Sequence, residues 1–101
     1  MAVVEADVEQ LQAALALGAK LIDVREVHEY ESGHVAQAAL VPLRTVPDHI
    51  DEFRDANPVY VICLSGVRSH RVCEFLAQQG VNAINVAGGM NAWADMGLPV
   101  R

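Results

Sequence analysis

The sequence predicts an α/β domain in which a central, mainly parallel five-stranded sheet carries helices on both faces. Short apolar, β-branched runs alternate with segments of helical periodicity, an order typical of parallel strands joined by right-handed helical crossovers. Polar residues gather where two of these runs end, and open α/β sheets collect their functional groups there. The chain has 101 residues, enough for one core, so we expect a single domain over residues 1–101.

Five short apolar runs predict the strands. Each contains β-branched residues and is bounded by residues that favour turns. Pro42 ends the third run, because proline cannot donate a hydrogen bond to a neighbouring strand, and the pair Asn57-Pro58 precedes the fourth. The fourth run carries no charge and leads to Cys63, so we expect it to be buried on both faces. The expected strands are 3–4, 21–24, 38–41, 59–63 and 83–86.

The segments between the strands have helical periodicity and recognisable ends. Asp7 and Gln10 have the spacing of a capping box, and Gly18 follows the apolar stripe of the first helix. Pro47 suits the first turn of the third helix, where its missing N–H is not needed. Gly80 suits the residue just after the fourth helix. The expected helices are 7–17, 26–32 with Gly33 as its stop, 47–55, a helix from 69 to Gly80, and 90–96, which carries Trp93.

Composition and charge narrow the classes of function. Hydrophobic residues make up 52% of the chain and charged residues 20%, as in globular proteins. A formal net charge of −6 argues against nucleic acid or an anionic membrane as a partner. The acidic first ten residues and the lack of a long apolar run argue against a targeting or membrane segment, so we expect a cytoplasmic protein. Two cysteines in a chain with an apolar core favour reduced thiols over disulfides.

The stretch around Cys63 is suited to holding a thiolate. The strand at 59–63 leads into a small loop, Leu64-Ser65-Gly66, which can turn sharply because glycine tolerates positive φ. The following helix directs unpaired N–H groups and the positive end of its dipole towards the sulfur. Both lower the pKa of a cysteine, so Cys63 is the candidate nucleophile. Arg68, five residues later, is placed to close the loop and to bind an anionic donor.

Three stretches in a defined order carry a family resemblance. The first runs from Leu21-Ile22-Asp23-Val24-Arg25-Glu26 through Glu29-Tyr30, Gly33-His34 and Ala38 to Pro42-Leu43, the second is Cys63-Leu64-Ser65-Gly66-Val67-Arg68-Ser69, and the third is Gly88-Gly89-Met90-Asn91-Ala92-Trp93 followed by Gly97-Leu98-Pro99-Val100. With this order and spacing, the chain resembles a single rhodanese (sulfurtransferase) domain over nearly its full length. The resemblance implies a parallel sheet flanked by helices and a catalytic cysteine that carries sulfur as a persulfide. Only Cys63 matches that cysteine.

The expected site has a nucleophile, a donor-binding loop and a scaffold. The Cys63 thiolate attacks a sulfane sulfur and keeps it as a persulfide until cyanide, a thiol or a protein removes it. The donor is expected to contact Leu64, Ser65, Gly66, Val67, Arg68 and Ser69. Asp23 and Arg25 are expected to pair or to brace loops, and Arg25 could also pair with Glu29 four residues later. By resemblance, His34 has a structural role.

Leu64 makes the identity of the donor an open question. Thiosulfate-using members of the family often carry a basic or polar residue at this position, so Arg68 alone would have to hold a dianion. The donor is therefore a small anionic sulfur compound such as thiosulfate, or else a low-molecular-weight or protein persulfide. An apolar Leu64 is also suited to a surface that docks a protein donor or acceptor.

Two alternatives to a sulfurtransferase remain. A cysteine and an arginine around a ring of amides also resemble the loop of cysteine phosphatases and arsenate reductases. Four residues separate Cys63 from Arg68, one fewer than in a phosphatase-type loop, and a smaller ring fits one sulfur better than a phosphoryl group. A non-catalytic module that delivers or senses sulfur is the other alternative. The presence of Cys63, Gly66 and Arg68 together favours the enzyme.

The second cysteine and the histidines are expected to lie outside the chemistry. Cys73 shares a helix face with Val72 and Leu76, which predicts an inert core thiol, although a resolving thiol for Cys63 is the alternative. The C-x6-H-x2-C spacing of Cys63, His70 and Cys73 matches no compact zinc pattern. We therefore expect neither a metal nor a cofactor.

Overall fold

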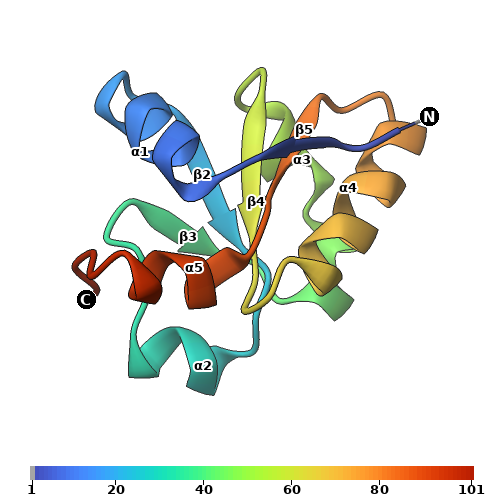
Figure 1. Ribbon diagram of the computed structural model, residues 1–101. Helices are drawn as coiled ribbons and strands as arrows, with labels where there is room; N and C mark the ends of the chain where they lie inside the picture. The colour runs from blue at the N-terminus through green and yellow to red at the C-terminus, as the bar shows by residue number, and fades with distance from the viewer. Residues whose placement is uncertain (1) are drawn as a thin grey trace.

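A parallel five-stranded sheet forms the centre of the computed structural model, which describes residues 2–101 (Figure 1). The strand order is β1-β5-β4-β2-β3, and each of the four neighbouring pairs is parallel. The strands are β1 (Val4–Ala6), β2 (Lys20–Asp23), β3 (Ala38–Leu40), β4 (Val59–Ile62) and β5 (Ala83–Val86). Because β4 lies in the middle, the residue that follows it, Cys63, emerges at the centre of one edge of the sheet.

Helices cover both faces of the sheet and enclose two apolar clusters. One face packs against a 3-10 helix, α3 and α4 through residues such as Val46, Phe53 and Leu76. The other packs against α1 and α5 through residues such as Leu11 and Trp93. The helices are α1 (Val8–Ala16), α2 (Val27–Ser32), η1 (Leu43–Asp48, the 3-10 helix), α3 (Ile50–Arg54), α4 (Val67–Gln78) and α5 (Gly89–Asp95).

The structure confirms the fold class and finds each expected strand and helix with ends shifted by up to three residues. The first strand is Val4–Ala6 and not 3–4, and the 3-10 helix η1 (Leu43–Asp48) was not expected. The capping box at the start of α1 is present, since Asp7 accepts from Gln10 N–H and Gln10 accepts from Asp7 N–H, both at 2.8 Å. Val59, Val61 and Ile62 of β4 are fully buried, as the uncharged run predicts for a strand covered on both faces.

Two helix starts differ from the prediction by two or more residues. Pro47 lies inside η1 and not in the first turn of α3, because the chain leaves the 3-10 helix at His49 (φ −130°) and starts again at Ile50. Helix α4 begins at Val67, two residues before the expected start, because Gly66 takes φ +97° and lets the chain turn directly into the helix. Within residues 2–101, no helix has the length and apolar character that crossing a membrane requires.

Candidate active site

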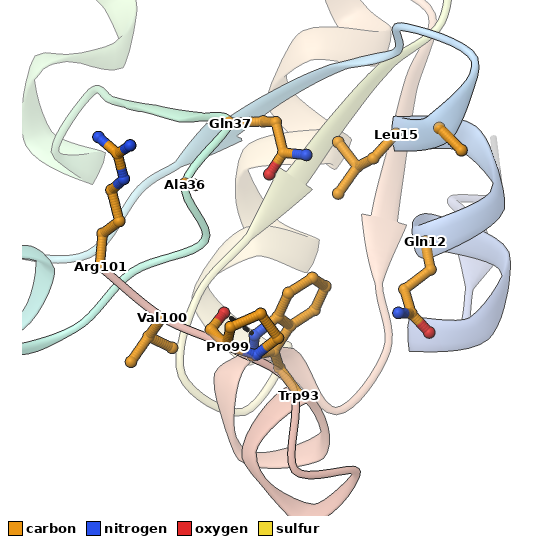
Figure 2. A pocket seen from close by; sticks show the side chains of 9 residues that line it. Gln12, Leu15, Ala36, Gln37, Trp93, Pro99, Val100 and Arg101 are labelled. Carbon is orange, nitrogen blue, oxygen red and sulfur yellow. Dashed lines mark hydrogen bonds between the residues drawn. The ribbon is translucent and has the colours of Figure 1, made fainter.

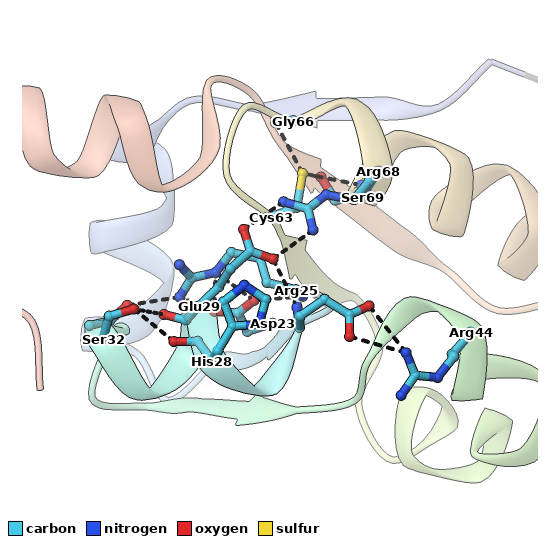
Figure 3. A network of polar contacts seen from close by, with 12 residues as sticks. Asp23, Arg25, His28, Glu29, Ser32, Arg44, Cys63, Gly66, Arg68 and Ser69 are labelled. Atoms are coloured by element: carbon cyan, nitrogen blue, oxygen red, sulfur yellow. Dashed lines mark hydrogen bonds and ion pairs between the residues drawn. The ribbon is translucent and has the colours of Figure 1, made fainter.

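Three hydrogen-bond donors converge on the sulfur of Cys63, which is buried at the carboxyl end of β4 (Figure 3). The N–H of Gly66 lies 3.1 Å from Sγ, the N–H of Ser69 lies 3.3 Å from it, and Ser69 Oγ lies 3.2 Å from it. Both amides belong to the start of α4, where N–H groups have no partner within the helix. The loop therefore forms a cradle that favours negative charge on the sulfur.

The balance of burial and hydrogen bonding sets the pKa of Cys63. Burial raises the pKa of the thiol, but the Ser69 hydroxyl and the amides of Ser69, Gly66 and Ser65 stabilise the thiolate. The hydrogen bonds outweigh burial, so the pKa of Cys63 lies below its ordinary value. The other cysteine, Cys73, is buried in the core, where burial first, and then the charges of Glu5 and Cys63, raise its pKa to about 12. Only Cys63 is thus prepared as a nucleophile.

The first residues of α5 hold the loop in place. The N–H of Met90 donates to the carbonyl of Cys63 at 2.9 Å, and the N–H of Asn91 donates to the carbonyl of Leu64 at 3.0 Å. This close approach requires glycine at 89, where φ is +52° and a Cβ would collide with both of those carbonyls. The Gly88-Gly89 pair of the sequence therefore docks α5 onto the backbone of the cradle.

Asn85, a buried residue of β5, connects the cradle to β1, and sequence reasoning did not identify it. Its side-chain N–H groups donate to the carbonyl of Gly66 at 3.1 Å and to the carboxylate of Glu5 at 2.9 Å. Its Oδ1 accepts from the hydroxyl of Ser69. A hydroxyl has one proton, so Ser69 donates either to Asn85 or to Cys63 at a given moment. The signal in the sequence was a lone asparagine within the apolar run 83–86.

The guanidinium of Arg68 is held by the carboxylate of Glu29, a pairing that sequence reasoning did not identify. Glu29 of α2 accepts from Nη1 at 2.8 Å through Oε1 and from Nη2 at 3.0 Å through Oε2 (Figure 3). The bond to Arg68 lowers the pKa of Glu29 to about 2, and in return the pKa of Arg68 is raised. The expected Asp23–Arg25 pair is present, whereas the alternative i, i+4 pair of Arg25 with Glu29 is not formed, because Glu29 pairs with Arg68.

The Asp23–Arg25 pair is buried beneath this region. Arg25 Nη2 lies 2.8 Å from Asp23 Oδ2 and also donates to the carbonyl of Gly33 at 2.8 Å. His34, the next residue, donates from Nδ1 to the carbonyl of Tyr30 at 2.7 Å and stacks on the Tyr30 ring. These contacts tie the end of β2 to the end of α2, so they position the helix that carries Glu29.

The loop residues expected to bind the donor fall into two groups. Ser65, Gly66 and Ser69 direct amides or a hydroxyl to the sulfur. Leu64 and Val67 instead expose their side chains, by 41% and 60%. A hollow of about 240 Å³ adjoins Arg68 and is lined mainly by apolar residues of η1 and α4, with Arg71 at its side. Exposed apolar side chains and this largely apolar hollow therefore lie beside the cradle, together with the two arginines.

The other groups considered from the sequence lie apart from the cradle. His70 Nε2 lies 3.8 Å from Glu5 and its Nδ1 3.6 Å from Glu74, on the exposed side of α4. Among the residues that the structure describes, no three His, Cys, Asp or Glu side chains are grouped to hold a metal ion. A cavity of about 470 Å³ between α1, Gln37 and the C-terminal segment has Trp93 and Arg101 in its wall, but no residue of the 63–69 loop lines it (Figure 2).

Comparisons with known proteins agree with this geometry. Residues 7–96 match the model of the family described as Rhodanese-like domain. The chain is 36% identical to a sulfurtransferase of Allochromatium vinosum over 81 residues, which cover 79% of this chain and 76% of that protein. It is 34% identical to the thiosulfate sulfurtransferase GlpE of Actinobacillus pleuropneumoniae, over 83% of this chain and 79% of that one. The crystal structure of a rhodanese-like domain protein from Staphylococcus aureus is similar, with a TM-score of 0.85, 36% identity and coverage of 97% and 98%.

Proposed function

Because this chain belongs to the family of rhodanese-like domains, we propose that it is a sulfurtransferase that moves sulfane sulfur through a persulfide on Cys63. We also propose that residues 1–101 work as one domain, and that the protein acts in the cytoplasm, where a reducing environment preserves the thiol. The observation that carries the proposal is the convergence of the Gly66 amide, the Ser69 amide and the Ser69 hydroxyl on one buried sulfur.

The proposed reaction has two displacement steps. In the first, the thiolate of Cys63 attacks the outer sulfur of the donor, so that a Cys63 Sγ–S bond forms and the S–S bond of the donor breaks. The leaving group departs with the electron pair, as sulfite from thiosulfate or as a thiolate from a persulfide. In the second, cyanide, a thiolate or a protein acceptor attacks the outer sulfur and releases the Cys63 thiolate. No general base is needed, because the cradle already lowers the pKa of the thiol.

A mass measurement tests the proposal directly. After incubation with thiosulfate or a small persulfide, the protein should gain the mass of one sulfur atom, and cyanide should remove it with formation of thiocyanate. Cys63→Ser should abolish the gain, whereas Cys73→Ser should retain it, because Cys73 is a core thiol with a raised pKa. If the folded protein gains no sulfur from either donor, or if Cys63→Ser still loads, the proposal is wrong.

A sulfur-delivery role is the second candidate, and one relative favours it. The chain is 36% identical over 74 residues to a putative sulfur carrier protein of Bacillus subtilis, of which it covers 40%. The exposed apolar side chains of Leu64 and Val67 beside the cradle are suited to a protein acceptor. A delivery module would load on Cys63 but release sulfur only to its partner protein, whereas the sulfurtransferase should turn over repeatedly with cyanide or a small thiol as the acceptor, so multiple-turnover assays with these small acceptors separate the candidates.

A further inference from the structure

We propose that Glu29 sets the donor specificity: by occupying the guanidinium of Arg68, it disfavours dianionic donors such as thiosulfate and makes persulfides of thiols the preferred donor class. The inference rests on the proposed function of Cys63. It assigns a role in substrate selection to a residue of α2, thirty-nine positions away from Arg68 in the sequence.

Arg68 does not offer a free fork of donors to an incoming anion. Both of its terminal nitrogens donate to the Glu29 carboxylate, at 2.8 Å and 3.0 Å. Bidentate pairing of this kind uses the geometry with which arginine would otherwise grip a sulfonate or a phosphate. The guanidinium lies close enough to Cys63 for the thiolate charge to contribute to raising the pKa of Arg68, after the larger contribution of the bond to Glu29. The pair therefore lies near the sulfur, where a donor must arrive.

Glu29 is fixed in this position by its own helix. Its Oε1 also accepts from the N–H of Glu26 at 3.0 Å, which closes the capping box at the start of α2. Moving the carboxylate away from Arg68 would therefore break this capping hydrogen bond of α2. A thiosulfate ion that binds Arg68 would have to displace the Glu29 carboxylate or lie next to it. In the second case the two negative groups would repel each other.

Two other arginines near the cradle are already paired with carboxylates. Arg25 is buried against Asp23, and Arg44 pairs with Glu26 at 3.1 Å. Arg71 lines the hollow beside Arg68, one turn further along α4 and away from the sulfur-binding amides. The exposed side chains next to the loop, Leu64 and Val67, are apolar. A neutral ion pair with apolar neighbours suits a donor whose body is a thiol compound rather than a sulfonate.

A persulfide donor satisfies the chemistry without a second anion to bind. The Cys63 thiolate attacks the outer sulfur of R–S–SH, the new Sγ–S bond forms, and the S–S bond of the donor breaks. The leaving group RS⁻ carries away the electron pair, and the proton stays on the transferred sulfur or passes to RS⁻. Both the charge and the oxidation level of the system are conserved, so no further reactant is needed.

Glu29→Gln tests this role, because glutamine keeps an oxygen for the Glu26 N–H but loses the charge. Loading of Cys63 is followed by mass with two probes, thiosulfate and cysteine persulfide. The thiosulfate concentration that gives the half-maximal loading rate should fall by roughly fivefold or more in the variant. A change of this size is expected when one nearby charge is removed from a partly exposed site. The loading rate with cysteine persulfide should stay within about twofold of the parent protein, which also shows that the variant is folded.

Two matched variants distinguish donor selection from general charge or folding effects. Glu26→Gln removes one carboxylate from the start of the same helix but leaves Arg68 paired, so thiosulfate use should not change. In an Arg68→Ala background, Glu29→Gln should help thiosulfate less, because no guanidinium is left to be released and only the repulsion by the Glu29 carboxylate is removed. If Glu29→Gln misfolds, Glu29→Asp, which shortens the carboxylate, should give a smaller gain with thiosulfate.

The outcomes separate this inference from the proposed function. Equal gains from Glu26→Gln and Glu29→Gln, or no gain with thiosulfate in either Glu29 variant while cysteine persulfide still loads Cys63, would overturn the role of Glu29 alone. Failure of the parent protein to load from either probe would overturn the sulfurtransferase proposal, and the specificity inference with it.

Discussion

The hydroxyl of Ser69 has one proton and two possible acceptors, Cys63 Sγ and Asn85 Oδ1. The hydrogen bond to the sulfur can therefore form or break as the charge on the sulfur changes. When Cys63 is a thiolate, the hydroxyl of Ser69 stabilises the anion by donating to it at 3.2 Å. When the charge moves away from Sγ, the same proton can donate to Oδ1 of Asn85. Ser69 is buried, so water does not compete for either contact.

The first prediction concerns the ionisation of Cys63. Its folded-state pKa is lowered, so in a Cys73→Ser background the ultraviolet absorbance of the thiolate should appear at a lower pH than in a free thiol. Ser69→Ala should move the midpoint upward by about one pH unit, the value of one hydrogen bond to a charged group. Ser65→Ala is the control, because the Ser65 amide that stabilises the sulfur remains. A midpoint at or above that of a free thiol contradicts the cradle.

The second prediction concerns Asn85. Asn85→Ala leaves the Gly66 carbonyl, the Ser69 hydroxyl and the Glu5 carboxylate without their shared partner. We expect the free energy of unfolding to fall by about 2 to 4 kcal/mol, measured by urea denaturation, because buried polar groups lose their hydrogen bonds. Asn82→Ala removes an exposed bond to Asn57 and should cost about 0.5 kcal/mol or less. Similar losses in the two variants would show that Asn85 has no special role.

At the scale of elements, the cradle is made where three of them meet. β4 delivers Cys63, α4 supplies the amides, and α5 binds the carbonyls of Cys63 and Leu64 through its first N–H groups. Backbone hydrogen bonds thus hold the loop from both its N–H and its C=O side, and the Asn85 side chain adds a further bond at Gly66. This explains why a short stretch with only one bulky residue at its tip, Leu64, can hold a defined geometry.

The third prediction tests the docking of α5. Gly89→Ala places a Cβ against the carbonyls of Cys63 and Leu64 at a positive φ, so α5 must move away from the loop. The unfolding free energy should fall by more than about 2 kcal/mol, and persulfide loading should fall with it. Gly97→Ala also has positive φ (+67°) but meets nothing within 4 Å, so it should cost only about 1 kcal/mol and leave loading intact. Normal loading in Gly89→Ala would show that α5 does not shape the cradle.

At the scale of the whole molecule, the Glu29–Arg68 pair joins helices that the sheet otherwise keeps apart. Tyr30 of α2 packs with the cluster on one face of the sheet, whereas Val72 and Leu76 of α4 pack with the cluster on the other. The pair therefore connects the two layers at the carboxyl edge of the sheet, next to Cys63. The pair can therefore stabilise the protein only when both layers are folded against the sheet.

The fourth prediction follows from the pKa of Glu29. Folding lowers that pKa from 4.5 to about 2, so the unfolded chain binds more protons between these values. The stabilisation is complete above pH about 4.5 and is lost as the pH falls towards about 2. Allowing for partial exposure of the pair, we expect about 1 to 2 kcal/mol in urea denaturation across this window. In Glu29→Gln this part of the pH dependence should vanish, and an unchanged pH profile would contradict the pairing.

Local features of the fold could be read from the sequence because their partners are neighbours in the chain. The capping box of Asp7 and Gln10 spans three residues, and the positive φ of Gly66 depends on glycine itself. The same holds for the placement of Cys63 at a strand end before a helix. Pro47 was assigned to the wrong helix because its fixed φ suits a 3-10 turn as well as a first α-turn.

The partners of the site residues could not be predicted in this way. Glu29 lies 39 residues from Arg68, and Asn85 lies 16 residues from Ser69. Both contacts exist because the order β1-β5-β4-β2-β3 brings the ends of distant elements to one edge of the sheet. Residue types and spacing identify the nucleophile, but only the topology shows which carboxylate neutralises Arg68 and which amide receives the Ser69 proton.

The full burial of Cys63 has a consequence for kinetics. A sulfur held by two backbone amides at the end of the central strand cannot travel to a second site, so donor and acceptor must approach the same sulfur in turn. The proposed transfer should therefore follow a ping-pong scheme, with parallel double-reciprocal plots when the concentrations of both substrates are varied. At high concentration the donor should inhibit by binding to the persulfide form of the enzyme, and the acceptor should inhibit by binding to the free thiolate form.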